Sequence, residues 1–395
     1  MTFLKGIYHY ILAWLGNVIY RRPSRQITVI GVTGTKGKTT TVEIVRAIFE
    51  AAGRRVTVSS SIHVKIGEKV LKKKTSNTMP GRFFVKRFLR QSVNAKCDVA
   101  IIEVTSQGVL QHRHRFIDFD MCVFLNIAPE HIESHGSFEK YRDAKVKFFK
   151  DAARDSQKIQ KYFVMNERDP ATEYFHKAIL GKGESIFFTK DTTQKFHMSS
   201  WLSSDFNRDN AAAAIAVAET LQISGSTIGR ALQDFGGVPG RMEYVVERPF
   251  AIVVDYAHTP DSLEAIYKAV RARHNGSLIC VLGAAGGGRD AWKRPVMGEV
   301  AGRMCDAVIL TDEDPYDENP QKILEDIEKG IQKNTAKVFK ILDRKEAIKK
   351  ALLLAKPRDA VVLTGKGAEH SIHVAHGKEI PWSDQETAGE LLKGL

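Results

Sequence analysis

Short apolar runs and helical patterns with one apolar face alternate along most of this chain. The apolar runs that predict strands cover residues 27–32, 98–104, 121–126, 162–166, 251–255, 278–283, 307–311 and 360–364. Amphipathic or alanine-rich patterns predict helices at 42–52 and 209–221. This alternation indicates βαβ units around mainly parallel sheets, and therefore an α/β fold.

A cluster rich in glycine at 236–240 interrupts this alternation, and a new series of strands begins after it. The length of 395 residues and the apolar content of 43% fit two or three folded domains. We expect an N-terminal helix at 1–25, a central domain at 26–243 and a C-terminal domain at 244–395. A lysine run at 72–74 is expected at the solvated edge of a hairpin.

The first 22 residues predict an amphipathic helix. Its apolar stripe consists of Leu4, Ile7, Ile11, Leu15 and Val18, widened by Phe3, Trp14 and Ile19 and followed by Arg21, Arg22 and Arg25. Polar residues interrupt the stripe, so a membrane-spanning segment is not expected. Two alternatives remain: residues 3–20 contact a membrane surface peripherally, or the helix packs on the protein's own body or on a partner subunit.

Glycines and phosphate-binding residue types follow the first predicted strand, in the stretch Gly34-Thr35-Lys36-Gly37-Lys38-Thr39-Thr40. Gly34 and Gly37 can adopt backbone angles closed to other residues, so their N–H groups can point at anionic oxygens beside a helix N-terminus. In a loop of this kind, Lys38 reaches the β- and γ-phosphates and Thr39 ligates Mg²⁺. The stretch therefore predicts a nucleotide phosphate site.

Charge and cysteine content narrow the class of protein further. The net charge of +13 favours anionic partners such as nucleotides, nucleic acid or anionic lipid, without choosing between them. The four cysteines, Cys97, Cys122, Cys280 and Cys305, are far apart in the sequence and form no CxxC pair. We therefore expect buried thiols in a reducing, cytoplasmic compartment, with neither a zinc site nor a disulfide framework.

Further motifs follow the phosphate loop in a fixed order. They are Glu103-Val104-Thr105-Ser106-Gln107, Asn126–His131, Tyr141–Lys145, Asp205–Asn210, Val238–Glu243, Asp255–Ser262 and Gly283–Met297. With the loop spacing G-T-x-G-K-T-T, they resemble the Mur ligase superfamily over about residues 27–392, most closely the MurE type of peptidoglycan biosynthesis. The resemblance implies a central P-loop ATPase domain with a mainly parallel sheet and a C-terminal Rossmann-like domain.

The resemblance also implies the catalytic centre. Lys38, Glu103, His131 and Lys145 would be catalytic, and Thr39, Glu103, His131 and Lys145 would hold Mg²⁺, with Lys145 carbamylated so that it becomes an anion. ATP would contact Gly34, Thr35, Gly37, Lys38, Thr39, Thr40, Asn210, Arg241 and Asp255. Asn207 or Asp209 could instead simply cap the alanine-rich helix.

The remaining predicted residues bind the two substrates. Thr78, Thr105, Gln111 and Arg113 match positions that bind the muramoyl-peptide, and Met79 replaces the usual threonine. Arg289, Lys293, Arg294, Glu313, Asp314, Gly365 and Glu369 would surround the incoming amino acid. Relatives that add diaminopimelate have an arginine at Tyr316, which pairs with the distal carboxylate, so we expect a diamino acid such as L-lysine here. A solvated, helix-capping turn is the other interpretation of the acidic residues.

Only about 25 residues precede the central domain, so we expect the UDP-binding domain of MurE enzymes to be missing and the acceptor to be held otherwise or carried on a lipid. The predicted activity is an ATP-dependent, ADP-forming amide ligase that works through an acyl phosphate. The alternatives are a ligase of the folylpolyglutamate or cyanophycin type, and the Mur-like partner of an amidotransferase. A nucleic-acid-binding NTPase is disfavoured, because no basic motif interleaved with aromatic residues is present.

Overall fold

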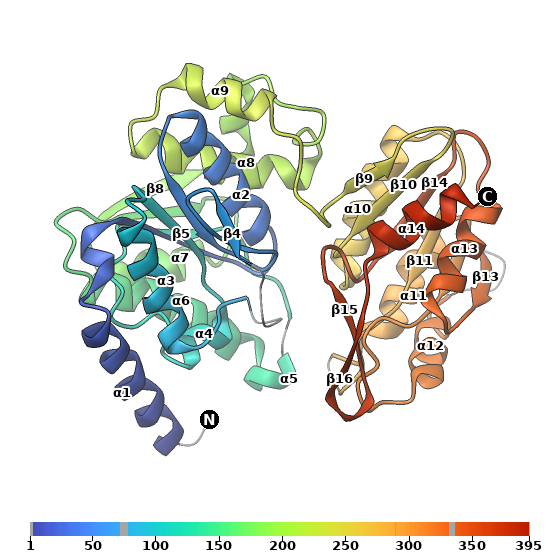
Figure 1. The fold of residues 1–395 in the computed structure, drawn as a ribbon, viewed down its shortest axis with the longest axis horizontal. Helices are drawn as coiled ribbons and strands as arrows, with labels where there is room; N and C mark the ends of the chain where they lie inside the picture. The colour runs from blue at the N-terminus through green and yellow to red at the C-terminus, as the bar shows by residue number, and fades with distance from the viewer. Residues whose placement is uncertain (1–2, 72–77, 131, 289, 332–335, 395) are drawn as a thin grey trace. The chain divides into compact units, whose positions relative to one another are not determined.

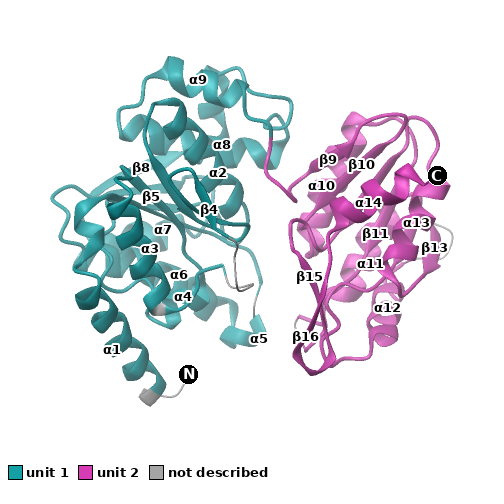
Figure 2. Ribbon diagram, viewed as in Figure 1, with its two compact units in different colours: residues 1–236 teal, residues 237–395 magenta. Residues whose placement is uncertain are grey.

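The protein is described here by a computed structural model covering residues 3–71, 78–130, 132–288, 290–331 and 336–394. It divides into two compact units, residues 1–236 and 237–395 (Figure 2). The predicted separation of the domains between 243 and 244 stays a prediction. Among the described residues, every helix is too short or too polar to cross a membrane.

Unit 1 is built on an eight-stranded sheet with the order β4-β3-β2-β5-β1-β6-β7-β8 (Figure 1). The strands are β1 (Thr28–Thr33), β2 (Val56–Ser59), β3 (Val64–Ile66), β4 (Lys69–Leu71), β5 (Val99–Glu103), β6 (Met121–Phe124), β7 (Tyr162–Asn166) and β8 (Glu184–Phe188). Only the β2–β3 and β3–β4 pairs are antiparallel. The parallel core of the sheet therefore brings the carboxyl ends of β1, β5 and β6 to one edge, which is where α/β proteins bind ligands.

Helices cover this sheet in two layers. The main core lies between alternate strand residues and the helices α3 (Arg82–Asn94), α6 (Phe138–Asp155) and α7 (Thr172–Ile179). A second group, α2 (Lys38–Ala51), α8 (Asp205–Thr220) and α9 (Gly225–Gln233), packs together against the strands. The short helices α4 (Ser106–Leu110) and α5 (Ile132–His135) pack on α6, and α1 (Phe3–Ile19) packs on α3.

Unit 2 contains a six-stranded sheet with the order β13-β12-β11-β14-β10-β9, in which only β9 is antiparallel to its neighbour. The strands are β9 (Glu243–Val246), β10 (Ala251–Asp255), β11 (Leu278–Leu282), β12 (Ala307–Leu310), β13 (Lys337–Lys340) and β14 (Ala360–Thr364), with a separate hairpin of β15 (Ser371–Val374) and β16 (Lys378–Pro381). The helices are α10 (Pro260–Arg273), α11 (Lys293–Met304), α12 (Pro320–Glu328), α13 (Arg344–Leu354) and α14 (Asp384–Lys393). This arrangement confirms the predicted α/β fold class.

The strongly patterned elements occur where the sequence predicts them. The runs at 162–166, 251–255 and 360–364 are β7, β10 and β14. Helix α2 starts at Lys38, earlier than its apolar pattern suggests, because Gly37 adopts a left-handed conformation and ends the phosphate loop there. The edge strands β4, β8, β9 and β13, the inner strands β2 and β3, and the hairpin β15–β16 were not predicted, because a strand of three to five residues gives too short a pattern to recognise. The lysine run at 72–74 lies outside the described residues.

The prediction that all four cysteines are free thiols is wrong. Cys280 on β11 and Cys305 at the end of α11 form a disulfide, with their Cα atoms 6.1 Å apart. The crossover from β11 through α11 to the neighbouring parallel strand β12 returns the chain beside its starting point, which a separation of 25 residues does not reveal. Cys97 and Cys122 are free and buried, as predicted.

Candidate active site

The phosphate loop connects the end of β1 to the start of α2 and is fixed by residues from other segments. Thr35 N–H donates to the carbonyl of Asn126 at 2.9 Å, and Lys36 N–H donates to Asn126 Oδ1 at 2.9 Å. The hydroxyls of Thr35 and Tyr141 lie 3.1 Å apart. Thr39 and Thr40 are buried in the first turn of α2. The loop is therefore preorganised by motifs that the sequence places about 90 and 105 residues further along.

Two lysines meet at one carbonyl of this loop. Lys38 Nζ donates to the carbonyls of Gly34 at 3.0 Å and Thr35 at 2.8 Å. Lys145 Nζ, from α6, donates to the same Gly34 carbonyl at 2.8 Å and is buried. Burial holds the pKa of Lys145 well below its ordinary value, and the nearby charge of Lys38 lowers this pKa further. A neutral amine at Lys145 is thus favoured.

Glu103 ends β5 beside the phosphate loop, because Val32 of β1 is its partner in the parallel ladder. Its carboxylate is fully buried and accepts hydrogen bonds from Ser61 N–H and Ser61 Oγ, both at 2.9 Å. The hydroxyls of Ser61 and Thr78 also lie 2.9 Å apart. Ser61 thus connects the predicted metal ligand to a predicted acceptor residue. No sequence signal marks Ser61 as a site residue, because a serine after a short strand is typical of any loop.

The predicted acceptor residues in unit 1 gather around α4. Thr105 caps this helix by accepting from Gly108 N–H at 3.1 Å. Arg113 donates to Gln111 Oε1 at 2.6 Å and to the backbone carbonyl of Met79. The structure therefore brings Thr78, Thr105, Gln111 and Arg113 into one region beside Glu103, although His131, another predicted site residue, lies outside the described residues.

The side chain of Asn210, from α8, packs against Gly37 of the phosphate loop. An ideal Cβ on Gly37 would lie 2.0 Å from Asn210 Oδ1, and Thr41 Oγ1 donates to the same oxygen at 3.4 Å. Asn207, one turn earlier on α8, instead donates to the carbonyl of Trp201 at 2.9 Å. The two asparagines therefore have different roles, and Asn210 is the one that contacts the phosphate loop.

Replacing Gly37 by alanine is expected to weaken ATP binding at least tenfold. The φ of +79° disfavours any side chain, and the new Cβ would displace Asn210; strain of this kind costs on the order of 1–3 kcal/mol. Calorimetric titration with ATP measures the effect. Gly53→Ala is the matched control, because Gly53 has a φ of +75° but no atom within 4 Å of an added Cβ. Equal losses in both variants would contradict a specific role for the loop.

In unit 2, the residues predicted to bind ATP lie around the end of β10. Both carboxylate oxygens of Asp255 accept backbone N–H groups at 2.7 Å, from Met242 and Ala257. Arg241 precedes Met242 in the chain, so the hydrogen bond between Met242 and Asp255 also fixes its backbone. The guanidinium of Arg241 stacks over the ring of Tyr256, with its carbon 4.4 Å from the ring centre. Asp255 thereby fixes the backbone that presents Arg241.

The predicted amino-acid pocket contains an internal cation. Lys366 Nζ is buried and bonds Asp314 Oδ1 at 2.9 Å and Glu369 Oε2 at 2.8 Å. Glu313 is buried behind Gly365, and among the described residues its Oε2 has no hydrogen-bond partner. Burial raises the pKa of Glu313, whereas the nearby charges of His258, Lys366 and Lys293 act to lower it. Glu313 is therefore the acid of this group whose charge is least compensated by direct bonds.

Tyr316 and Arg294 are held by other parts of unit 2. Tyr316 stacks on His373 with ring centres 5.3 Å apart, and its N–H donates to the His373 carbonyl at 3.1 Å. Arg294, which is buried, forms a two-pronged pair with Glu318 at 2.6 and 2.9 Å. These bonds use the guanidinium of Arg294 within unit 2. Lys293 is buried beside it, and the predicted substrate residue Arg289 lies outside the described residues.

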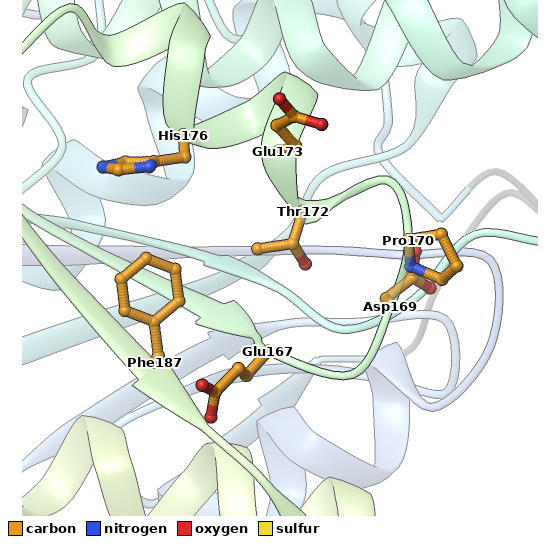
Figure 3. A pocket seen from close by; sticks show the side chains of 7 residues that line it. All are labelled: Glu167, Asp169, Pro170, Thr172, Glu173, His176 and Phe187. Atoms are coloured by element: carbon orange, nitrogen blue, oxygen red, sulfur yellow. The ribbon is translucent and has the colours of Figure 1, made fainter.

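A separate hollow of about 380 Å³ lies between β7, α7 and β8 (Figure 3). Its lining includes the three acids Glu167, Asp169 and Glu173, together with His176 and Phe187. Three carboxylates around one opening do not suit a nucleotide phosphate. Asp169 has a structural role, because its carboxylate accepts from Ile127 N–H at 2.8 Å and so supports the 126–130 segment behind the phosphate loop.

A phosphate loop with converging lysines, a buried carboxylate beside it and a buried acidic cluster in a second α/β unit are features expected of an ATP-dependent ligase. The family model described as "Mur ligase middle domain" matches residues 32–200, and "Mur ligase, glutamate ligase domain" matches residues 240–367. The chain belongs to the Mur ligase family and is an ADP-forming, amide-bond-forming enzyme of MurE type.

Relatives and solved structures agree with this membership. The diaminopimelate ligase of Syntrophomonas wolfei is 34% identical over 97% of this chain and 82% of its own length. The UDP-N-acetylmuramyl-tripeptide synthetase of Roseiflexus sp. is also 34% identical, with the same coverage. In fold, the chain matches a solved diaminopimelate ligase with a TM-score of 0.63 at 24% identity, covering 97% of this chain and 83% of that one. The folylpolyglutamate synthase of Mycobacterium tuberculosis matches with a TM-score of 0.73 at 16% identity, covering 98% and 95%.

Proposed function

We propose that this ligase joins a diamino acid to the terminal carboxylate of a muramoyl-peptide-like acceptor. The observation that supports this most is the chain of contacts from the end of β1, which leads into the phosphate loop, through Glu103 and Ser61 to Thr78. It links the site of phosphoryl transfer to the residues proposed for the acceptor. An acceptor carboxylate held by Thr78 and Arg113 would therefore approach the γ-phosphate of ATP.

The reaction would proceed in two steps. An acceptor carboxylate oxygen attacks the γ-phosphorus and ADP leaves, which forms an acyl phosphate. The uncharged amine of the amino acid then attacks the acyl carbon, and the tetrahedral intermediate expels phosphate and loses a proton to form the amide. Lys38 would neutralise charge on the transferring phosphoryl group, which is the main contribution that a protein can make to this step.

Mg²⁺ would be held by oxygen atoms around the phosphate loop. The Thr39 hydroxyl and the buried Glu103 carboxylate are hard ligands of the kind that this ion prefers. Lys145 fits a cation site only as its carbamate, and His131 is the fourth proposed ligand. Bound Mg²⁺ would screen the phosphate charges. Among the described residues, no three His, Cys, Asp or Glu side chains already form a metal cluster.

The identity of the amino acid depends on Tyr316 and Glu313. Tyr316 cannot form the ion pair that an arginine makes with the distal carboxylate of diaminopimelate, and Glu313 is a buried acid that would repel it. We propose a preference for lysine or another diamino acid with a free terminal ammonium. Asp314 and Glu369 contribute less than their charges suggest, because Lys366 already pairs with both. Arg294 would position this segment rather than bind substrate.

Competition between amino acids tests this proposal. The protein is supplied with ATP, a UDP-linked or lipid-linked muramoyl dipeptide, and equal amounts of lysine, ornithine and diaminopimelate, and the products are weighed by mass spectrometry. We expect lysine to be incorporated at least tenfold over diaminopimelate, because an unpaired buried carboxylate costs several kcal/mol. Tyr316→Arg should shift the products toward diaminopimelate. Preferential incorporation of diaminopimelate by the unaltered chain would contradict the proposed pocket, and the names of its relatives make this the sharpest alternative.

The acceptor, the membrane and other partners are separate questions. We propose that both substrates are small or lipid-linked molecules and that nucleic acid is not a partner, in keeping with a cytoplasmic ATP-consuming ligase. The predicted peripheral membrane contact through residues 3–20 is an independent proposal, because it depends on α1 and not on the catalytic residues.

A further inference from the structure

Helix α1 packs on unit 1 through the face opposite to its apolar stripe. Ala13, Gly16 and Asn17 are buried, and an ideal Cβ on Gly16 would lie 3.3 Å from the ring of Phe83 on α3. Small residues at this spacing let the two helices approach closely. The helix is thus fixed to the body without using the large apolar side chains that its sequence pattern emphasises.

Those large side chains are exposed instead. Ile11, Trp14 and Ile19 have 52%, 50% and 55% of their surface accessible, and Ile7, Leu15 and Val18 on the same helix are also exposed. Folded proteins rarely leave a continuous row of large apolar side chains in water unless the row contacts something. The exposed face of α1, defined by these six residues, is therefore a docking surface.

The charges around this surface identify its partner. The segment 3–26 and helix α3 contain eight lysines and arginines but no aspartate or glutamate. Lys5, Arg21 and Arg22 at the two ends of α1 are exposed, as is Arg87 on α3. Acids do lie nearby, since Arg115, which stacks over Tyr10 of α1, is paired with Asp155. An apolar helical face with an excess of cations around it is complementary to an anionic lipid bilayer, into whose surface such a helix sinks lengthwise.

We infer that the exposed face of α1 binds anionic membrane surfaces. This would also bring the proposed acceptor residues close to the lipid, since Tyr10 on α1 contacts Phe116 with ring centres 5.0 Å apart, just beyond Arg113. This last consequence rests on the proposed function, whereas the membrane contact itself does not.

Vesicle sedimentation of the full chain tests the inference. We expect binding to phosphatidylglycerol vesicles, weaker binding to phosphatidylcholine vesicles, and loss of binding at high salt. Ile11→Glu/Trp14→Glu should reduce the bound fraction at least tenfold, and Arg21→Gln/Arg22→Gln about fivefold per charge removed. The control Leu353→Glu changes a side chain that is 61% exposed on α13 and should bind as the unaltered chain does.

The outcomes separate the possible partners of α1. Equal binding to both vesicle types, or unchanged binding of Ile11→Glu/Trp14→Glu, would overturn the inference. So would lipid-independent oligomers that this double variant abolishes, because α1 would then dock on a second copy of the chain. ATP turnover with a soluble acceptor should be the same in all variants. Vesicle binding without any ligase activity would refute the proposed function and leave the membrane contact standing.

Discussion

Lys38→Ala is expected to lower ATP turnover by about 10²–10³-fold while the protein stays folded. Lys38 Nζ lies over the carbonyls of Gly34 and Thr35, at the mouth of the phosphate loop. When ATP enters, the ammonium can exchange these carbonyls for phosphate oxygens, and removing one such charge from the transition state costs about this much in rate. Steady-state release of ADP is the measurement.

The control for this variant is Lys150→Ala, which removes an exposed lysine from α6. It should turn over ATP at the normal rate, so that a general effect of lowering the net charge is excluded. A folded Lys38→Ala protein with nearly normal turnover would remove the phosphate loop from the mechanism.

Lys145→Ala is expected to be inactive, with a loss of at least about 10²-fold, and to recover partly when formate or acetate is added. Burial and the charge of Lys38 lower the pKa of Lys145, so the amine is available in its neutral form. A neutral amine can add to CO₂ and lose a proton, which yields a carbamate. This anion would supply the ligand that a small carboxylate replaces in the variant.

Carbon-13 NMR of the protein in labelled bicarbonate measures the carbamate directly. Lys86 provides a matched control, because it is also fully buried, has a pKa well below the ordinary value, and donates to the carbonyl of Arg115 at 2.7 Å. The carbamate signal should survive Lys86→Met and disappear in Lys145→Ala. A carbamate signal that disappears in Lys86→Met and survives in Lys145→Ala would show that burial alone, and not the phosphate site, selects the modified lysine.

The local features of the site could be predicted because they depend on neighbours in the chain. A glycine-rich turn between an apolar strand and a helix creates a phosphate loop through backbone geometry alone, and Gly37 has the left-handed conformation that this requires. Glu103 ends a predicted strand, so its place at the ligand-binding edge of a parallel sheet followed from the strand itself. The other site residues were predicted from the ordered motifs, through their resemblance to the Mur ligase superfamily.

Contacts between distant segments could not be predicted in this way. Ser61 acquires its role from Glu103, more than forty residues away, and Lys366 neutralises acids that the sequence presents as an open pocket. The disulfide of Cys280 and Cys305 likewise depends on the β11–α11–β12 crossover. None of these pairs leaves a periodic signal, because periodicity reports only the faces of single elements.

In helix α1, the effects of the local sequence pattern and of tertiary packing can be separated most clearly. Its sequence alone determined that it is helical and that one stripe is apolar, since spacing controls both. Only the tertiary structure decided which stripe faces the body. The side with Ala13 and Gly16 packs on α3, because small residues allow close helix contact, and the large apolar residues are left outside.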